Sequence, residues 1–122
     1  MNQNYLNKLV INSSNSSDNF NQLSKEEIIS KALEYHSNGN INEAARYYNC
    51  FLKRGFEDPI VFSNFGVICI QLGKYELAIN LYQRSISKFP NNLEAYSNLG
   101  NLYKELGKTD QAENLLRKAL II

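Results

Sequence analysis

Apolar residues recur at helical spacing along most of the chain. The spacing of Phe62, Phe65, Cys69 and Leu72 is one example. Recurrence every three or four residues is the pattern of an amphipathic helix, because an α-helix has about 3.6 residues per turn. The pattern therefore predicts an all-α chain from residue 25 onward.

Small residues return along the chain with a period of 34. The two sets that define the period are Gly39, Gly73 and Gly107, and Ala44, Ala78 and Ala112. A period of this length is typical of stacked supersecondary units. It divides the chain into repeats 25–58, 59–92 and 93–122, each predicted to be two helices joined at the periodic glycine.

Helix starts can be read from local residue types. Ser24 and Glu27 form a capping-box pattern, and Asp58 is followed by Pro59, which suits the first turn of a helix. Asn40 is expected to open the second helix of the first repeat.

Two further glycines fall inside predicted helices. Gly66 and Gly100 occupy equivalent positions, although glycine costs about 1 kcal/mol relative to alanine in a helix. Their presence predicts that the two helices of a hairpin cross closely there, with the periodic alanines on the other side.

The repeats resemble the tetratricopeptide repeat. Its pattern of aromatic, Leu-Gly, Tyr, Ala, aromatic, small residue and Pro is matched by Phe62, Phe65, Gly66, Cys69, Ala78, Tyr82, Ser85 and Pro90, and by Tyr96, Leu99, Gly100, Tyr103, Ala112, Leu116 and Ala119. The first repeat departs from it at Lys31 and at Phe56, where Pro is usual. The resemblance implies an α-α superhelix (solenoid) of three tetratricopeptide helical hairpins over residues 25–122.

Residues 1–24 differ in composition from the repeats. They contain seven Asn and five Ser, with only Lys8 and Asp18 charged. Such a segment buries too little apolar surface to offset its ordering entropy, so we expect it to be mostly disordered. The apolar cluster from Tyr5 to Ile11 leaves open a short docked element.

Composition and charge exclude several functional classes. The formal net charge is +1, which gives no bulk attraction to nucleic acid, and no stretch is long and apolar enough to span a membrane. One histidine, His36, and two separated cysteines, Cys50 and Cys69, provide no metal-site pattern. We expect a cytoplasmic, non-enzymatic protein without metal or cofactor.

The resemblance also implies a binding surface. In this family the first helix of each repeat lines a concave groove that receives peptides. Carried onto this chain, the candidate peptide-binding residues are Ser63, Asn64, Val67, Ser97, Asn98 and Asn101. The carboxylate clamp of some relatives is matched only at Asn64, which disfavours a chaperone-tail receptor.

The third repeat is similar to repeats in the superhelix of O-linked N-acetylglucosamine transferase, where an asparagine ladder binds peptide backbone. The segment Ala95–Asn101 carries this likeness, and Asn64 and Asn98 would be two rungs. A carboxamide offers a donor and an acceptor to any peptide unit. Asparagine is also an ordinary surface residue in this Asn-rich chain, so both roles stay open.

The predicted function is a non-catalytic protein-protein interaction module that binds a peptide segment of a protein partner in the concave groove. The alternative is the N-terminal targeting or oligomerisation part of a larger enzyme such as a glycosyltransferase. Weak self-association through the C-terminal helix is a further expectation, because Leu120, Ile121 and Ile122 continue its apolar pattern.

Overall fold

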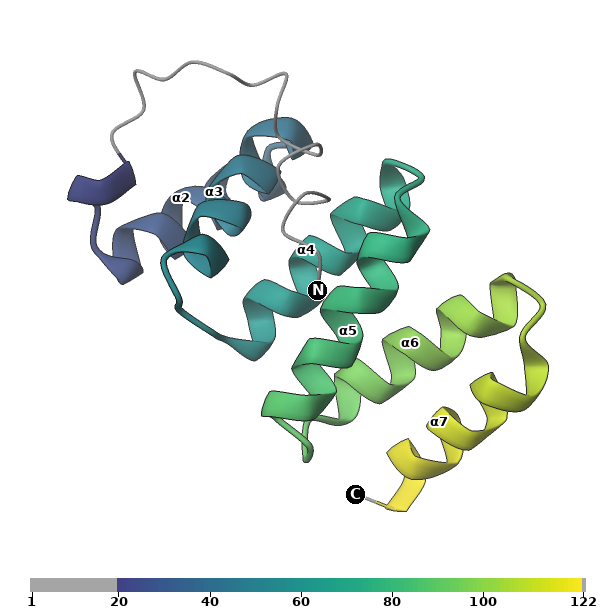
Figure 1. Cartoon of the computed structure of the whole chain (residues 1–122). Helices are drawn as coiled ribbons and strands as arrows, with labels where there is room; N and C mark the ends of the chain where they lie inside the picture. Colours follow the sequence, from purple (N-terminus) through teal and green to yellow (C-terminus); the bar gives the residue numbers. More distant parts are fainter. Residues whose placement is uncertain (1–19, 122) are drawn as a thin grey trace. The chain divides into compact units, whose positions relative to one another are not determined.

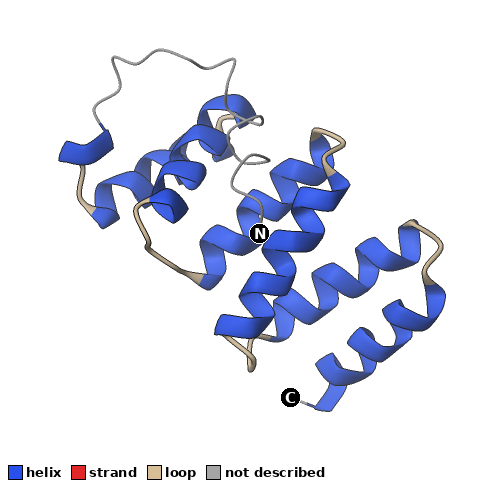
Figure 2. Ribbon diagram, viewed as in Figure 1, coloured by secondary structure: helices blue, strands red, loops and turns tan. Residues whose placement is uncertain are grey.

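The computed structural model describes residues 20–121, and this range contains six α-helices, one short 3-10 helix and no strand (Figures 1 and 2). Residues 1–19 of the predicted leader lie outside the described residues. The elements are η2 (Phe20–Gln22), α2 (Lys25–Ser37), α3 (Ile41–Lys53), α4 (Pro59–Gln71), α5 (Tyr75–Lys88), α6 (Leu93–Glu105) and α7 (Thr109–Ile121).

The chain divides between Glu57 and Asp58 into two compact units, one residue before the predicted boundary between the first and second repeats. The first unit holds α2 and α3, and the second holds α4 to α7. Each predicted repeat therefore contains one pair of helices.

The predicted helix starts are largely confirmed. Ser24 Oγ accepts from Glu27 N at 3.0 Å and Glu27 Oε1 accepts from Ser24 N at 2.8 Å, which completes the capping box. The Asp58 carboxylate accepts from Ile60 N at 2.8 Å. Asn40 occupies the N-cap position of α3, but its side chain makes no capping hydrogen bond.

The periodic glycines lie in the turns between paired helices. Gly39, Gly73 and Gly107 have φ values of +80°, +73° and +80°, a left-handed conformation that a side chain disfavours. A Cβ added at any of the three would contact nothing within 4 Å. Backbone conformation, and not lack of space, therefore explains the period.

The first unit is a hairpin with an aromatic core. Ile28, Ala32, Tyr48 and Phe51 are fully buried between α2 and α3. Asn49 is also buried, at 3% exposure, and its Oδ1 accepts no hydrogen bond within the described part of the chain.

Phe56 explains why the first repeat departs from the family pattern. Its ring packs against Phe51 with centroids 5.3 Å apart, and the Arg54 guanidinium and the Lys25 ammonium lie over it at 5.2 and 5.9 Å. An aromatic ring thus closes the end of this hairpin, at the position where proline is usual.

The second unit shows why Gly66 and Gly100 interrupt their helices. A Cβ added at Gly66 would lie 2.4 Å from the Tyr82 ring, and one added at Gly100 would lie 2.8 Å from the Leu116 side chain. Both distances are below van der Waals contact. The predicted close crossing of paired helices is therefore confirmed, but the side chains that face the glycines are Tyr82 and Leu116, one turn after the periodic alanines. Of those alanines, Ala112 also comes near, through its carbonyl oxygen, 3.4 Å from a Cβ at Gly100.

α5 and α7 occupy equivalent places in their repeats but differ in their neighbours. α5 packs against both α4 and α6, whereas α7 packs mainly against α6. Ala112 is the buried residue of α7, and Leu120 and Ile121 at its end are 86% and 83% exposed.

Candidate peptide-binding face

The six predicted site residues lie on two first helices that contact each other in the second unit. α4 carries Ser63, Asn64 and Val67, and α6 carries Ser97, Asn98 and Asn101. Ser63 is buried, Asn64, Ser97 and Asn98 are half-buried, and Val67 and Asn101 are exposed. These six residues together with Glu94 are called the α4/α6 face.

A chain of hydrogen bonds joins the two helices across this face. Asn98 Nδ2 donates to Ser63 Oγ at 3.0 Å, and Ser63 Oγ donates to Glu94 Oε1. Ser63 is only 8% exposed, so its hydroxyl is satisfied inside the protein as donor and acceptor. Asn98 is thus partly held by Ser63 and is not freely solvated.

The role of Glu94 was not predicted from the sequence. Ser63 contacts residues 31 and 35 positions later, which are one helical turn apart on α6. The two spacings bracket the 34-residue period. Polar residues at these two offsets are therefore a sequence pattern that could have identified the bridge.

Apolar side chains are exposed on the same two helices. Ile60 and Val67 on α4 are 58% and 37% exposed, and Leu93 at the start of α6 is 50% exposed. α4 has no charged residue, while α6 carries Glu94, Lys104 and Glu105. The two helices thus offer exposed apolar and carboxamide side chains with one carboxylate at the N-terminal end of α6.

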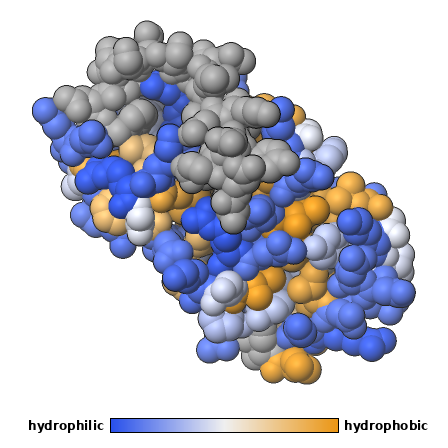
Figure 3. Space-filling model, in the orientation of Figure 1, coloured by the Kyte–Doolittle hydropathy of each residue, from blue (hydrophilic) through white to orange (hydrophobic). Residues whose placement is uncertain are grey.

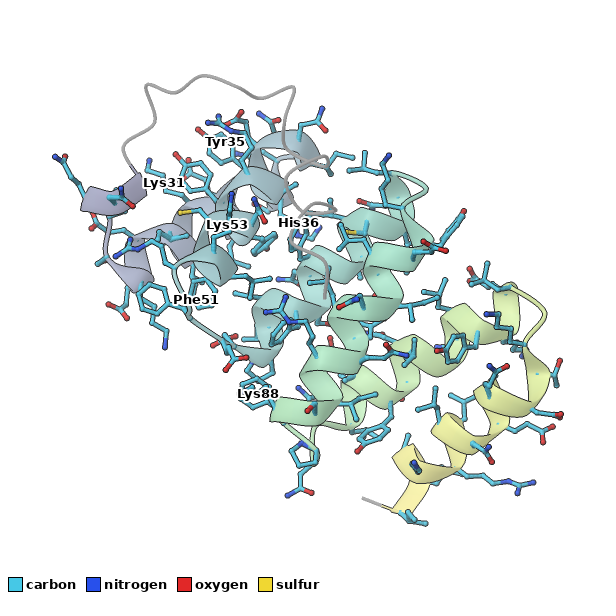
Figure 4. The ribbon with its side chains drawn as sticks, viewed as in Figure 1. Lys31, Tyr35, His36, Phe51, Lys53 and Lys88 are labelled. Atoms are coloured by element: carbon cyan, nitrogen blue, oxygen red, sulfur yellow. The ribbon has the colours of Figure 1, made fainter. Side chains whose placement is uncertain are left out.

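The residues of the first repeat at corresponding positions belong to the first unit. They are Ile29, Ser30, Leu33 and His36 on α2. His36, labelled in Figure 4, is half-buried, and its Nδ1 lies 3.3 Å from the buried Tyr48 hydroxyl. His36 is therefore part of the packing of the first hairpin and not a freely solvated surface residue.

The cysteines are suited to packing. Cys50 and Cys69 are both buried and unpaired. Burial raises the pKa of the Cys69 thiol to about 12, and it also raises the pKa of Cys50. A thiol that stays protonated at neutral pH is a poor nucleophile, so Cys69 is suited to an inert role in the core.

Residues 20–121 show no features of a metal centre or of a membrane-spanning helix. No group of three or more His, Cys, Asp or Glu side chains in this range could hold a metal ion. No helix of the same range has the length and apolarity required to cross a bilayer.

An open pocket lies between α5, α6 and α7. Its volume is about 320 Å³, and it is lined by Gln83, Ile86, Leu99, Tyr103, Gln111, Asn114 and Leu115. The hydropathy surface in Figure 3 shows apolar patches among polar ones over these helices. At about 100° per residue, Leu99 and Tyr103 point away from Ser97 and Asn101 around α6, so this pocket is separate from the α4/α6 face.

Comparison with known proteins identifies the repeats. Family models described as "TPR repeat" and "Tetratricopeptide repeat" match residues 66–107 and 93–122. Tetratricopeptide repeats are therefore present in the chain, and repeats of this kind form protein-protein interaction scaffolds.

Three relatives show that similar repeats occur in longer proteins. Protein CTR9 homolog of Arabidopsis thaliana is 32% identical over 92 residues, which cover 72% of this chain and 8% of that protein. The uncharacterized protein YgeG of Escherichia coli K12 is 34% identical over 65 residues, which cover 53% of this chain and 40% of that protein. Tetratricopeptide repeat protein 8 of Caenorhabditis elegans is 28% identical over 97 residues, which cover 78% of this chain and 19% of that protein. The chain spans less than half the length of each relative.

Solved structures support the fold. A crystal structure of MamA has a TM-score of 0.75 and 22% identity, with 80% of this chain and 57% of that chain covered. A second structure, MamA MSR-1 C2, has a TM-score of 0.71 and 17% identity, with 96% and 63% covered. The likeness confirms the predicted all-α fold built from helical hairpins.

Proposed function

We propose that this protein is a non-catalytic interaction module that binds an extended peptide segment of a partner protein along the α4/α6 face. One observation carries the proposal. The first helices of two successive repeats, α4 and α6, are in contact, and their polar side chains are joined by the hydrogen bond from Asn98 to Ser63. The bridge fixes one carboxamide before any ligand arrives, which lowers the entropy cost of binding.

The proposed recognition is of peptide backbone by asparagine. Asn98 uses one N–H on Ser63, and its Oδ1 accepts no hydrogen bond from the described residues, so this oxygen is the group offered to a peptide N–H. Asn64 is the equivalent residue one repeat earlier. This is the arrangement expected from the likeness to O-linked N-acetylglucosamine transferase repeats, and Val67 and Asn101 would flank the peptide.

A peptide-binding experiment tests the proposal. Peptides selected from a random dodecapeptide array should bind the full chain, and Asn64→Ala or Asn98→Ala should weaken each binder about twofold to tenfold, the value of one net hydrogen bond. Asn42→Ala, an exposed asparagine on α3, is the matched control and should change nothing. Affinities that are unchanged in the folded variants would contradict the proposal.

A second candidate function is the targeting or oligomerisation part of a larger enzyme such as a glycosyltransferase. The observation that favours it is that the chain spans only 8–40% of the three relatives. The expected outcome is copurification with a catalytic polypeptide, encoded in the same reading frame or separately. Fractionation would test the cytoplasmic location expected from the sequence.

Weak self-association is the third part of the proposal. Leu120 and Ile121 are exposed on α7, and burying such side chains in a second copy would remove apolar surface from water. Light scattering should show a mass that rises with concentration up to about 100 µM, and Ile121→Lys should suppress the rise. A constant monomer mass would contradict self-association without affecting peptide binding.

A further inference from the structure

The N-terminal end of the α4/α6 face holds two hydrogen-bond acceptors in fixed positions. Ser63 Oγ donates to Glu94 Oε1 and accepts from Asn98 Nδ2 at 3.0 Å, so one buried hydroxyl orients both side chains. The remaining oxygens, Glu94 Oε2 and Asn98 Oδ1, accept no hydrogen bond from the described residues. Residues four apart on a helix lie on the same side, so these oxygens belong to one surface.

We infer that Glu94 and Asn98 form a subsite for a cationic side chain, a lysine or an arginine of the bound peptide. This inference rests on the proposed function and names the chemistry of the partner. Lysine and arginine side chains carry only donors, and a carboxylate beside an amide oxygen supplies only acceptors at these two positions. A neutral side chain would gain no charge-assisted hydrogen bond from the Glu94 carboxylate, and an acidic side chain would be repelled by it.

Charge on the two helices agrees with this assignment. α4 has no charged residue, and the one cationic residue on α6 is Lys104, ten residues from Glu94, which is roughly 15 Å along a helix. Arg84 on α5 lies over the Phe62 ring, 5.2 Å from its centroid. Glu94 therefore has no cationic neighbour on its own helix or on α4 at this end of the face.

Apolar surface beside the carboxylate suits the stem of such a side chain. Leu93 precedes Glu94 and is 50% exposed, and Ile60 in the first turn of α4 is 58% exposed. Lysine and arginine bury their methylene groups on apolar surface while the charged end reaches a polar partner. Together these residues favour a peptide with a basic residue over one with only neutral residues.

The test uses the binders from the dodecapeptide array. Each binder is resynthesised with arginine replaced by citrulline, or lysine by glutamine, and measured against the full chain, Glu94→Gln and Glu105→Gln. Removing the cation should weaken binding to the natural chain and to Glu105→Gln about twofold to fivefold, as for exposed charged pairs. It should have little effect on Glu94→Gln, because the carboxylate is already absent. Glutamine keeps an acceptor for Ser63, and circular dichroism would verify the fold of each variant.

The outcomes separate the inference from the proposed function. One outcome would overturn the cationic subsite and leave peptide binding intact. In it, the binders depend on Asn64 or Asn98, but removing their cation weakens binding to Glu94→Gln as much as binding to the natural chain. If the selected binders contain no basic residue, the cationic subsite would likewise be overturned and peptide binding would stand. If no array peptide responds to Asn64→Ala or Asn98→Ala, the proposed function fails and the subsite fails with it.

Discussion

The hairpins α4/α5 and α6/α7 share one repeat pattern but differ in burial. Leu81 and Tyr82 on α5 are at most 1% exposed, whereas the equivalent Leu115 and Leu116 on α7 are half-buried. The difference follows from neighbours, because α6 covers α5 and α7 packs mainly against α6. In a stacked array each repeat is stabilised by its own packing and by the next repeat. The same residue type therefore contributes unequally in the two hairpins.

The largest expected effect comes from the two equivalent leucines. Leu81→Ala should lower the free energy of unfolding by about 2–5 kcal/mol, because a fully buried side chain leaves a cavity. Leu115→Ala should cost about 1 kcal/mol or less, because Leu115 lines an open pocket and loses little buried area. Urea denaturation followed by circular dichroism would measure both, and equal losses would contradict the role given to α6 as a cover.

The glycines at the helix crossings give the next comparison. Gly66→Ala places a Cβ against the buried Tyr82 ring, and overpacking of this kind costs about 1–3 kcal/mol. Gly100→Ala meets Leu116, a half-buried and flexible side chain that can move. The gain in helix propensity of about 1 kcal/mol should then make this substitution neutral or slightly stabilising.

Thermal melts of the two alanine variants would separate these cases. Gly66→Ala should melt several degrees below the natural protein, whereas Gly100→Ala should melt at or above it. A loss of similar size in both would show that the second crossing is as rigid as the first.

Alkaline pH should weaken the hairpin that contains Cys69. Its thiol has an ordinary pKa of 9.0 and a folded pKa of about 12, so folding favours the protonated form. This contribution is complete below pH 9 and is lost as pH rises toward 12, because only the unfolded chain ionises in that window. The loss should be about 1.4 kcal/mol at pH 10. Burial also raises the pKa of Tyr82 from 10.0 to about 12, which adds a further loss above pH 10.

Cys69→Ala provides the control for the pH dependence. Urea denaturation at pH 7, 9 and 10 should give a stability that falls less between pH 9 and 10 in this variant than in the natural chain. The cavity left by Cys69→Ala would instead lower the free energy of unfolding by the same amount at all three pH values. Parallel curves for the two proteins would contradict the burial of the thiol.

Much of the fold could be predicted from the sequence because its determinants are local. The capping box at Ser24, the N-cap at Asp58 and the left-handed turn at Gly73 each depend on a few neighbouring residues. The crossing at Gly66 was predicted because a glycine inside a helix requires a packing reason. The role of Phe56 was not predicted, because its ring packs through contacts particular to the first hairpin.

The candidate site was less predictable from the sequence. The equivalence of Asn64 and Asn98 followed from the repeat period, and their place on a binding face was implied by the family resemblance. The bridge from Asn98 through Ser63 to Glu94 depends on how two helices stack. The repeat period shows which positions in the repeats are equivalent, but it does not show which side chain contacts which. The pocket beside Leu115 was missed for the same reason, since three helices contribute to it.

The smallest expected effect concerns the bridge that joins the two hairpins. Asn98→Ala removes the hydrogen bond to Ser63, worth about 0.5–1.5 kcal/mol, and gains part of this back because alanine is the better helix former. The net loss of stability should therefore be below about 1 kcal/mol. Asn101→Ala, at an exposed position on the same helix, has only the propensity gain and should be neutral or slightly stabilising.

A double-mutant cycle with Ser63→Ala separates the bridge from these other terms. If the hydrogen bond couples α4 to α6, the losses of Ser63→Ala and Asn98→Ala should be less than additive in the double variant, by about 0.5 kcal/mol or more. The cycle of Ser63→Ala with Asn101→Ala should be additive. Additivity in both cycles would mean that apolar packing alone joins the hairpins, and that Asn98 is oriented by its own helix and not by Ser63.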